Sequence, residues 1–141
     1  MCIVVYIGSR SPLPLIPWNP ETPAFNVTAL TEQEMSACRH FTVPHVRYAG
    51  SHTDCGCGFN EGREYPDAVD EPATKRTEAL RSSSLLANYI RANQVEQIYS
   101  CWSGDESENR EFERRVSPDA LIAEDFFFRE RELLVIDHGT A

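Results

Sequence analysis

A chain of 141 residues with a net charge of −9 argues against nucleic-acid binding, which needs a clustered basic face, and against binding to anionic membrane surfaces. Its 41% hydrophobic and 25% charged residues are typical of a globular protein with a single domain, residues 1–141. No apolar run approaches the roughly 20 residues that a transmembrane helix needs. We therefore expect neither a nucleic acid nor a membrane as partner.

Residues 2–7 form an apolar, β-branched run that predicts a buried first strand. No basic residue precedes this run, and it is too short for the hydrophobic part of a signal peptide. We therefore expect a cytoplasmic protein, in which thiols stay reduced. An odd number of cysteines also fits poorly with a complete set of disulfides. The five are Cys2, Cys38, Cys55, Cys57 and Cys101.

A proline-rich stretch follows, with five prolines between residues 12 and 23. Such spacing forbids a helix and favours extended chain. The stretch could be a ligand for a proline-recognising module, but a stiff crossing over the body of the domain is the interpretation that we favour. Residues 25–30 alternate weakly in hydrophobicity, which predicts a short strand.

The next elements are a helix and a strand. Thr31 and Glu34 match a capping box, which predicts a helix from there to about Phe41 with Met35 and Cys38 facing the core. The two nearby histidines, at positions 40 and 45, are interpreted as surface or capping residues. Residues 46–49 read as the next strand.

Residues 50–72 lack a hydrophobic period and predict a long loop. A helix over 73–92 and a strand over 95–102 follow, so that the strand at 46–49, the helix and this strand form a βαβ unit. Such a unit makes its two strands parallel, with their carboxyl ends at one edge of the sheet.

The C-terminal part predicts a short helix that starts at Ser117-Pro118 and ends near residue 122. The apolar runs at 126–128 and 133–136, separated by charged residues, then predict a β-hairpin. Together the elements indicate an α/β or α+β fold, with a mixed sheet of about four to six strands and two main helices.

The stretch HTDCGCGF, residues 52–59, and the end of the strand at Cys101 would leave the sheet at the same edge, where ligands of α/β sheets bind. If the first strand is also parallel, its end at Ser9 and Arg10 reaches that edge. Ser9, Arg10 and Ser51 would then form an anion pocket with exposed backbone N–H groups.

The cysteines of this edge leave several interpretations open. His52, Cys55, Cys57 and Cys101 together suit tetrahedral zinc. Cys55 and Cys57 alone, one glycine apart, could instead form a strained and therefore easily reduced disulfide. In either case the protein would carry a thiol-rich site at one edge of the sheet.

Besides metal binding and a disulfide, two hypotheses give a cysteine the role of a nucleophile, and a third gives the cysteines a purely structural role. A loop cysteine could pair with His52 as base, or removal of Met1 could leave Cys2 with a free amine beside its thiol. Alternatively, the glycines shape a tight turn, Phe59 fills the core and the cysteines only pack. The chain would then be a non-catalytic binding or interaction module. The acids at 105, 106 and 108 are interpreted as a solvated loop.

The motif Gly-Ser-His-x-x-Cys-Gly-Cys-Gly-Phe at residues 50–59, with Met1-Cys2 and the proline-rich segment up to Trp18, resembles a group of small uncharacterised bacterial proteins. The resemblance spans most of the first 60 residues. It implies a bacterial cytosolic setting, but no substrate and no catalytic residues, so enzymatic activity, small-molecule or protein partner and oligomeric state all stay open.

Overall fold

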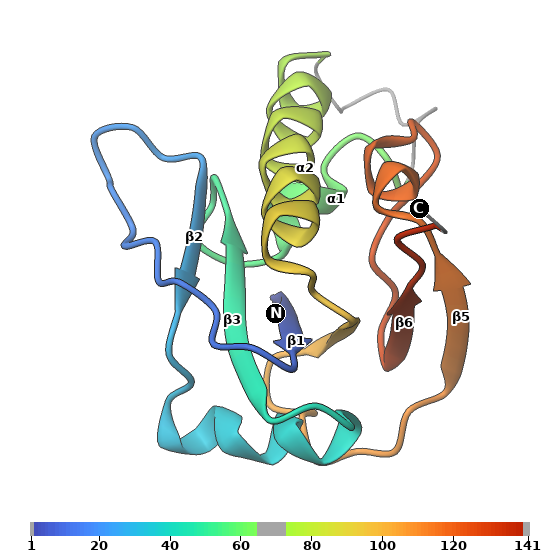
Figure 1. Ribbon diagram of the computed structural model, residues 1–141. Coiled ribbons are helices and arrows are strands. Elements are labelled where there is room, and N and C mark those ends of the chain that lie inside the picture. Colours follow the sequence, from blue (N-terminus) through green and yellow to red (C-terminus); the bar gives the residue numbers. More distant parts are fainter. Residues whose placement is uncertain (1, 65–72, 140–141) are drawn as a thin grey trace.

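The fold is a six-stranded sheet with helices on both faces, seen in a computed structural model that describes residues 2–64 and 73–139 (Figure 1). The last part of the predicted loop over 50–72 lies outside the described residues. The strands are β1 (Ile3–Ser9), β2 (Phe25–Thr28), β3 (His45–Ser51), β4 (Gln97–Trp102), β5 (Phe112–Val116) and β6 (Glu132–Ile136). The helices are the 3-10 helices η1 (Glu32–His40) and η2 (Pro118–Ile122), the short α1 (Cys57–Asn60) and the long α2 (Ala73–Asn93).

The sheet order is β2-β3-β1-β4-β6-β5, so the first strand lies in the middle of the sheet. Strand β1 pairs antiparallel with both β3 and β4. Strands β3 and β4 therefore run in the same direction, as the βαβ prediction requires, but with β1 between them. The predicted mixed sheet with two main helices, an α+β class, is confirmed.

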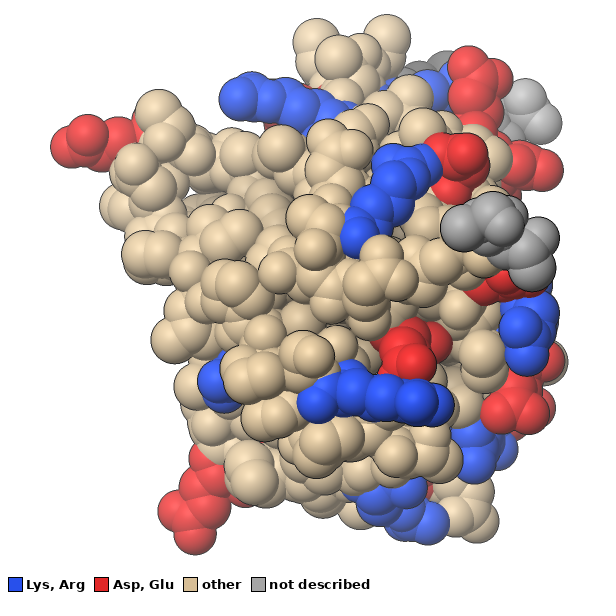
Figure 2. All heavy atoms as spheres, in the orientation of Figure 1, with Lys and Arg blue, Asp and Glu red and all other residues tan. Residues whose placement is uncertain are grey.

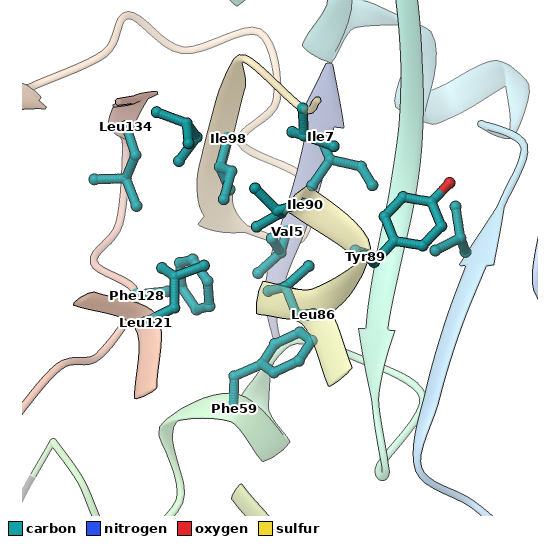
Figure 3. Close-up of a cluster of buried hydrophobic side chains, with 14 of the residues drawn as sticks. Val5, Ile7, Phe59, Leu86, Tyr89, Ile90, Ile98, Leu121, Phe128 and Leu134 are labelled. Atoms are coloured by element: carbon teal, nitrogen blue, oxygen red, sulfur yellow. The ribbon is translucent and has the colours of Figure 1, made fainter. Parts of the chain in front are cut away.

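Alternation of side chains along β1 divides the core into two parts. Val5 and Ile7 face the cluster beneath α2, where Leu86 and Ile90 are fully buried (Figure 3). The intervening Tyr6 faces a smaller cluster on the other side of the sheet, together with residues of η1. Because both faces of the strand are covered, the strand is apolar throughout instead of alternating.

The predicted hairpin near the C-terminus is wrong. Strand β6 pairs in parallel with β5 and antiparallel with β4, so both of its edges are occupied. Residues 126–128 form irregular chain, in which the Phe126 and Phe128 rings meet edge-on at 5.1 Å and pack into the larger core cluster. Burial of aromatic rings, rather than strand pairing, accounts for this apolar run.

Helix η1 begins at the predicted capping box: the Thr31 side chain accepts from the Glu34 N–H, and the Glu34 carboxylate accepts from the Thr31 N–H. Its buried residues are Ala37 and His40, whereas Met35, predicted to be buried, is 54% exposed. The 3-10 geometry explains the difference, because residues three apart share a face in a helix with 3.0 residues per turn.

His40 was expected at the surface but is buried. Its ring stacks on Tyr99 at 3.7 Å, and its Nε2 donates to the Glu106 carbonyl at 2.8 Å, since a carbonyl can only accept. Burial lowers the pKa of His40, and the positive charges of Arg39 and Arg110 lower it further, against the opposing effect of the Glu106 carbonyl. The surroundings of His40 therefore favour the neutral form of its imidazole.

We expect this histidine to make the protein less stable as the pH falls below about 6.5, the ordinary histidine pKa. In that range the unfolded chain binds a proton that buried His40 does not, so the free energy of unfolding decreases with decreasing pH. Urea unfolding between pH 7.5 and 5.5 measures the slope. A His40→Phe variant should flatten it, whereas His45→Asn should not; an unchanged slope in His40→Phe would contradict the assignment.

Charged side chains of both signs are interspersed on the face seen in Figure 2, without a continuous basic area there. No helix among residues 2–64 and 73–139 is both long enough and apolar enough to cross a membrane.

Candidate functional site

Three cysteine side chains meet where β1 begins. The Sγ atoms of Cys2, Cys55 and Cys57 all lie within 4.8 Å of one another, and we call them the thiol cluster. Cys2 directly precedes β1, whereas Cys55 lies in the turn after β3 and Cys57 begins α1. Cys2 is exposed and the other two are partly buried, so the cluster is open to solvent on one side.

The direction of β1 explains why Cys2 joins this cluster. Because β1 is antiparallel to β3, its first residues lie beside the last residues of β3. The turn is then fastened to the strand by two hydrogen bonds: the Gly56 N–H donates to the Ile3 carbonyl at 2.9 Å, and the Ile3 N–H donates to the Cys57 Sγ at 3.2 Å. The sequence pattern did not reveal Cys2 as a partner of the loop cysteines, because it left the direction of β1 open.

Gly56 is the residue that allows this approach. A Cβ atom at position 56 would lie 2.9 Å from the Ile3 carbonyl oxygen and 2.9 Å from the Val5 Cγ2. Such distances are shorter than van der Waals contact, so only glycine lets the backbone between the two cysteines lie against β1.

We predict that Gly56→Ala pushes the turn away from β1, with all five cysteines still present in the chain. Overpacking of this kind typically costs about 1–3 kcal/mol, measurable as a lower urea midpoint. Alkylation rates against pH would also show the Cys55 thiol titrating nearer the ordinary cysteine value, since the turn moves away from Cys2, one of the hydrogen-bond partners that lower its pKa. A variant with wild-type stability and wild-type Cys55 reactivity would contradict this account.

The turn itself is held by side chains of β2 and β3. The Ser51 hydroxyl donates to the Cys55 carbonyl at 2.6 Å, and the Asn26 side-chain N–H donates to Asp54 at 2.6 Å. Asp54 has a φ of 67°, a left-handed conformation that aspartate tolerates better than most residues. The structure thus confirms a tight turn, and it places the Phe59 side chain in the core.

The two loop thiols differ in acidity. Burial raises the pKa of the Cys55 thiol, but hydrogen bonds from Thr53, from the Cys57 backbone and from the Cys2 and Cys57 thiols outweigh it, and the net pKa is lowered. Burial, together with the charge of Cys55, raises the pKa of Cys57 to about 12. The arrangement therefore favours one thiolate at Cys55 that neighbouring protons stabilise.

Cys101 does not join the thiol cluster. It pairs with Val4 across the sheet and is buried among Tyr6 and Tyr99 on the face away from α2. Burial and the charges of Glu106 and Asp105 raise its pKa to about 12. Strand order explains the placement, because Cys101 belongs to β4 on one side of β1, whereas Cys55 and Cys57 follow β3 on the other side.

Ser9, Arg10 and Ser51 do not form one pocket. Ser9 pairs with the first residue of β3, whereas Ser51 is the last residue of that strand, so the two lie at opposite ends of β3. Arg10 pairs with Glu96 at 3.0 Å. The antiparallel direction of β1 separates these residues, and the same direction brings Cys2 to the thiol cluster.

The His52 side chain lies next to two carboxylates and does not belong to the thiol cluster. Its Nε2 lies 3.2 Å from the Glu61 Oε2 and 3.4 Å from the Glu78 Oε2, and we call these three side chains the His–Glu group. Sequence reasoning did not find Glu61 and Glu78. Glu61 directly follows α1 and Glu78 lies on α2, and only tertiary packing brings both residues to the end of β3.

A cavity of about 210 Å³ adjoins the thiol cluster, lined by Ile3, Cys57, Glu61 and Trp102 among others. Trp102 pairs with Ile3 across the sheet and is partly buried, so its indole forms part of the cavity wall.

Glu106, predicted to be solvated, is buried and accepts from the Tyr6 hydroxyl at 2.9 Å. Burial raises the pKa of Tyr6, and this hydrogen bond raises it further.

No protein-family model, no curated protein and no solved structure matches this chain.

Proposed function

We propose that this protein binds a thiophilic metal ion, Zn²⁺ or Cu⁺, through Cys2, Cys55 and Cys57. The single observation that carries the proposal is the convergence of three sulfur atoms within 4.8 Å from chain segments more than 50 residues apart. Thiolates are the ligands that both ions prefer. A group of three thiols held by β1 and a tight turn is preorganised for such an ion.

The separations suit this chemistry. With Zn–S bonds of about 2.3 Å, sulfur atoms around a tetrahedral zinc lie about 3.8 Å apart. Sulfur atoms already within 4.8 Å of one another need only small side-chain rotations to reach that spacing. A fourth ligand would come from water or a small molecule, since Cys57 lines the adjoining cavity. Three protein ligands with an open fourth position favour exchange or chemistry over a closed structural site.

Native mass spectrometry of anaerobically purified protein, reconstituted with Zn²⁺ or Cu⁺, tests the proposal. We expect Cys55→Ser/Cys57→Ser to bind one ion fewer per chain than the wild type, and Cys2→Ser to bind that ion more weakly. Cys38→Ser is the matched control, because Cys38 is partly buried outside the cluster. The same number of bound ions in wild type and double variant would refute metal binding by the thiol cluster.

The acidic Cys55 thiol beside an exposed Cys2 favours a second candidate function, thiol–disulfide exchange. The Cys55 thiolate would attack a small disulfide and release one thiolate. The deprotonated Cys2 sulfur would then displace the second, leaving a Cys2–Cys55 disulfide and two molecules of small thiol. Incubation with oxidised glutathione should yield a protein lighter by two hydrogens, except in the Cys55→Ser variant.

If both tests fail, so that the protein binds no metal and forms no such disulfide, the cysteines serve only as packing residues. The remaining interpretation would be a non-catalytic binding or interaction module, and a search for a protein partner would take precedence.

A further inference from the structure

The side chains around His52 fix its protonation pattern. The Ser82 hydroxyl has one proton, and it donates that proton to the Ala24 carbonyl at 2.7 Å, which can only accept. Its oxygen therefore accepts from the His52 backbone N–H at 3.1 Å and from the His52 Nδ1 at 2.9 Å. The hydrogen of a neutral His52 ring accordingly resides on Nδ1.

This pattern aims the Nε2 lone pair at two carboxylates. Nε2 lies 3.2 Å from the Glu61 Oε2 and 3.4 Å from the Glu78 Oε2. Three electron-pair donors so close together repel one another unless a positive charge lies between them. A proton shared between Nε2 and a carboxylate, or a metal cation bound by all three atoms, would remove this repulsion.

The geometry points to the cation: we propose that His52, Glu61 and Glu78 bind a first-row divalent cation, such as Mn²⁺ or Fe²⁺, at a site separate from the thiol cluster. With metal–ligand bonds of about 2.0–2.2 Å, neighbouring ligand atoms lie about 2.8–3.6 Å apart, from octahedral to tetrahedral geometry. The two observed separations fall in this range. One imidazole with two carboxylates suits a harder ion than the thiol cluster does.

Helix α2 provides two of the necessary groups. Glu78 and Ser82 are four residues apart and lie on one face of α2, so that Ser82 holds one side of the imidazole while Glu78 faces the other. Metal-binding histidines usually donate their second N–H to such a partner, which fixes the orientation of the ring. Ser82, which is buried, is thus a positioning residue for His52.

The His–Glu group is reached from solvent and adjoins a small cavity. The His52 side chain is 11% exposed and that of Glu78 is 61% exposed. They line a cavity of about 70 Å³ together with Ser82 and Arg81. That space is large enough to admit water, which could complete a coordination shell. Within the described part of the chain, Arg81 forms no ion pair with either carboxylate.

Electron paramagnetic resonance with added Mn²⁺ tests the site, since Mn²⁺ prefers carboxylate and imidazole ligands to thiols. The wild type should bind one Mn²⁺ per chain and show nitrogen coupling from the imidazole. Glu78→Gln, His52→Gln and Ser82→Ala should each weaken binding by about tenfold or more. Glu78 is mostly exposed, so its substitution is compatible with folding. Glu64→Gln, a carboxylate outside the His–Glu group, should bind Mn²⁺ as the wild type does.

The outcome is independent of the thiol cluster. Mn²⁺ binding should persist in the Cys55→Ser/Cys57→Ser variant, so failure of one site is distinguishable from failure of the other. Mn²⁺ that binds equally to wild type, Glu78→Gln and His52→Gln, or that shows no nitrogen coupling, would overturn the proposal. So would the absence of any binding, which would leave a proton on Nε2 as the bridge between the carboxylates.

Discussion

Replacing Arg63 with methionine should lower the free energy of unfolding by about 3–5 kcal/mol, since a buried acceptor left without a donor costs about 1–3 kcal/mol. Arg63 is only 1% exposed. Its Nη1 donates to the Phe59 carbonyl and the Ser83 hydroxyl, and its Nη2 donates to the Leu121 and Ala123 carbonyls at 2.6 Å each. Methionine fills much of the same volume but leaves these acceptors buried without donors.

The guanidinium keeps its charge in spite of burial. Burial lowers the pKa of Arg63 to about 10, while the charge of Asp125 opposes that effect, so the group stays protonated at neutral pH. Arg63→Lys should also be destabilising, because one ammonium cannot reach acceptors on three segments as a planar fork does.

Urea unfolding of Arg63→Met against wild type measures the effect. Arg81→Met, an arginine on the exposed side of α2, is the control and should change stability by less than about 0.5 kcal/mol. A loss below about 1 kcal/mol in Arg63→Met would mean that water replaces the guanidinium donors at little cost.

The second large effect is expected from Phe59→Ala, with a loss of about 3–5 kcal/mol from removed burial and the remaining cavity. Phe59 is fully buried and meets the Phe128 ring edge-on at 5.6 Å. As Figure 3 shows, it lies in the core beneath α2 near Leu86. The ring anchors α1, and therefore the segment that begins with Cys57.

Thermal unfolding and urea titration of Phe59→Ala give this value, with Leu85→Ala as control, since Leu85 is partly exposed on α2. If the wild-type stability is too low for the variant to fold, Phe59→Leu should show a smaller loss. A stable, fully folded Phe59→Ala protein would contradict the anchoring role. Because Arg63 bonds the Phe59 carbonyl, effects of combined substitutions should not be additive.

Local signals in the sequence were sufficient for most elements. The apolar run of β1, the capping box at Thr31 and the period of α2 each depend on neighbours within a few residues, and each element occurs where it was predicted. The pairing of β5 with β6 was missed, because residues 112–116 are mostly charged or exposed and carry a weak strand signal. The turn at Gly56 was likewise recognisable from its glycines.

The membership of the candidate sites depended on tertiary structure. The sequence by itself determined that chemistry-bearing residues cluster at His52, Cys55 and Cys57, since these lie within six residues of one another. Only the antiparallel direction of β1 decided that Cys2 joins them, and only the strand order, with β1 between β3 and β4, decided that Cys101 does not. Strand direction and strand order arise from long-range packing of apolar faces, which a local pattern of residues does not encode.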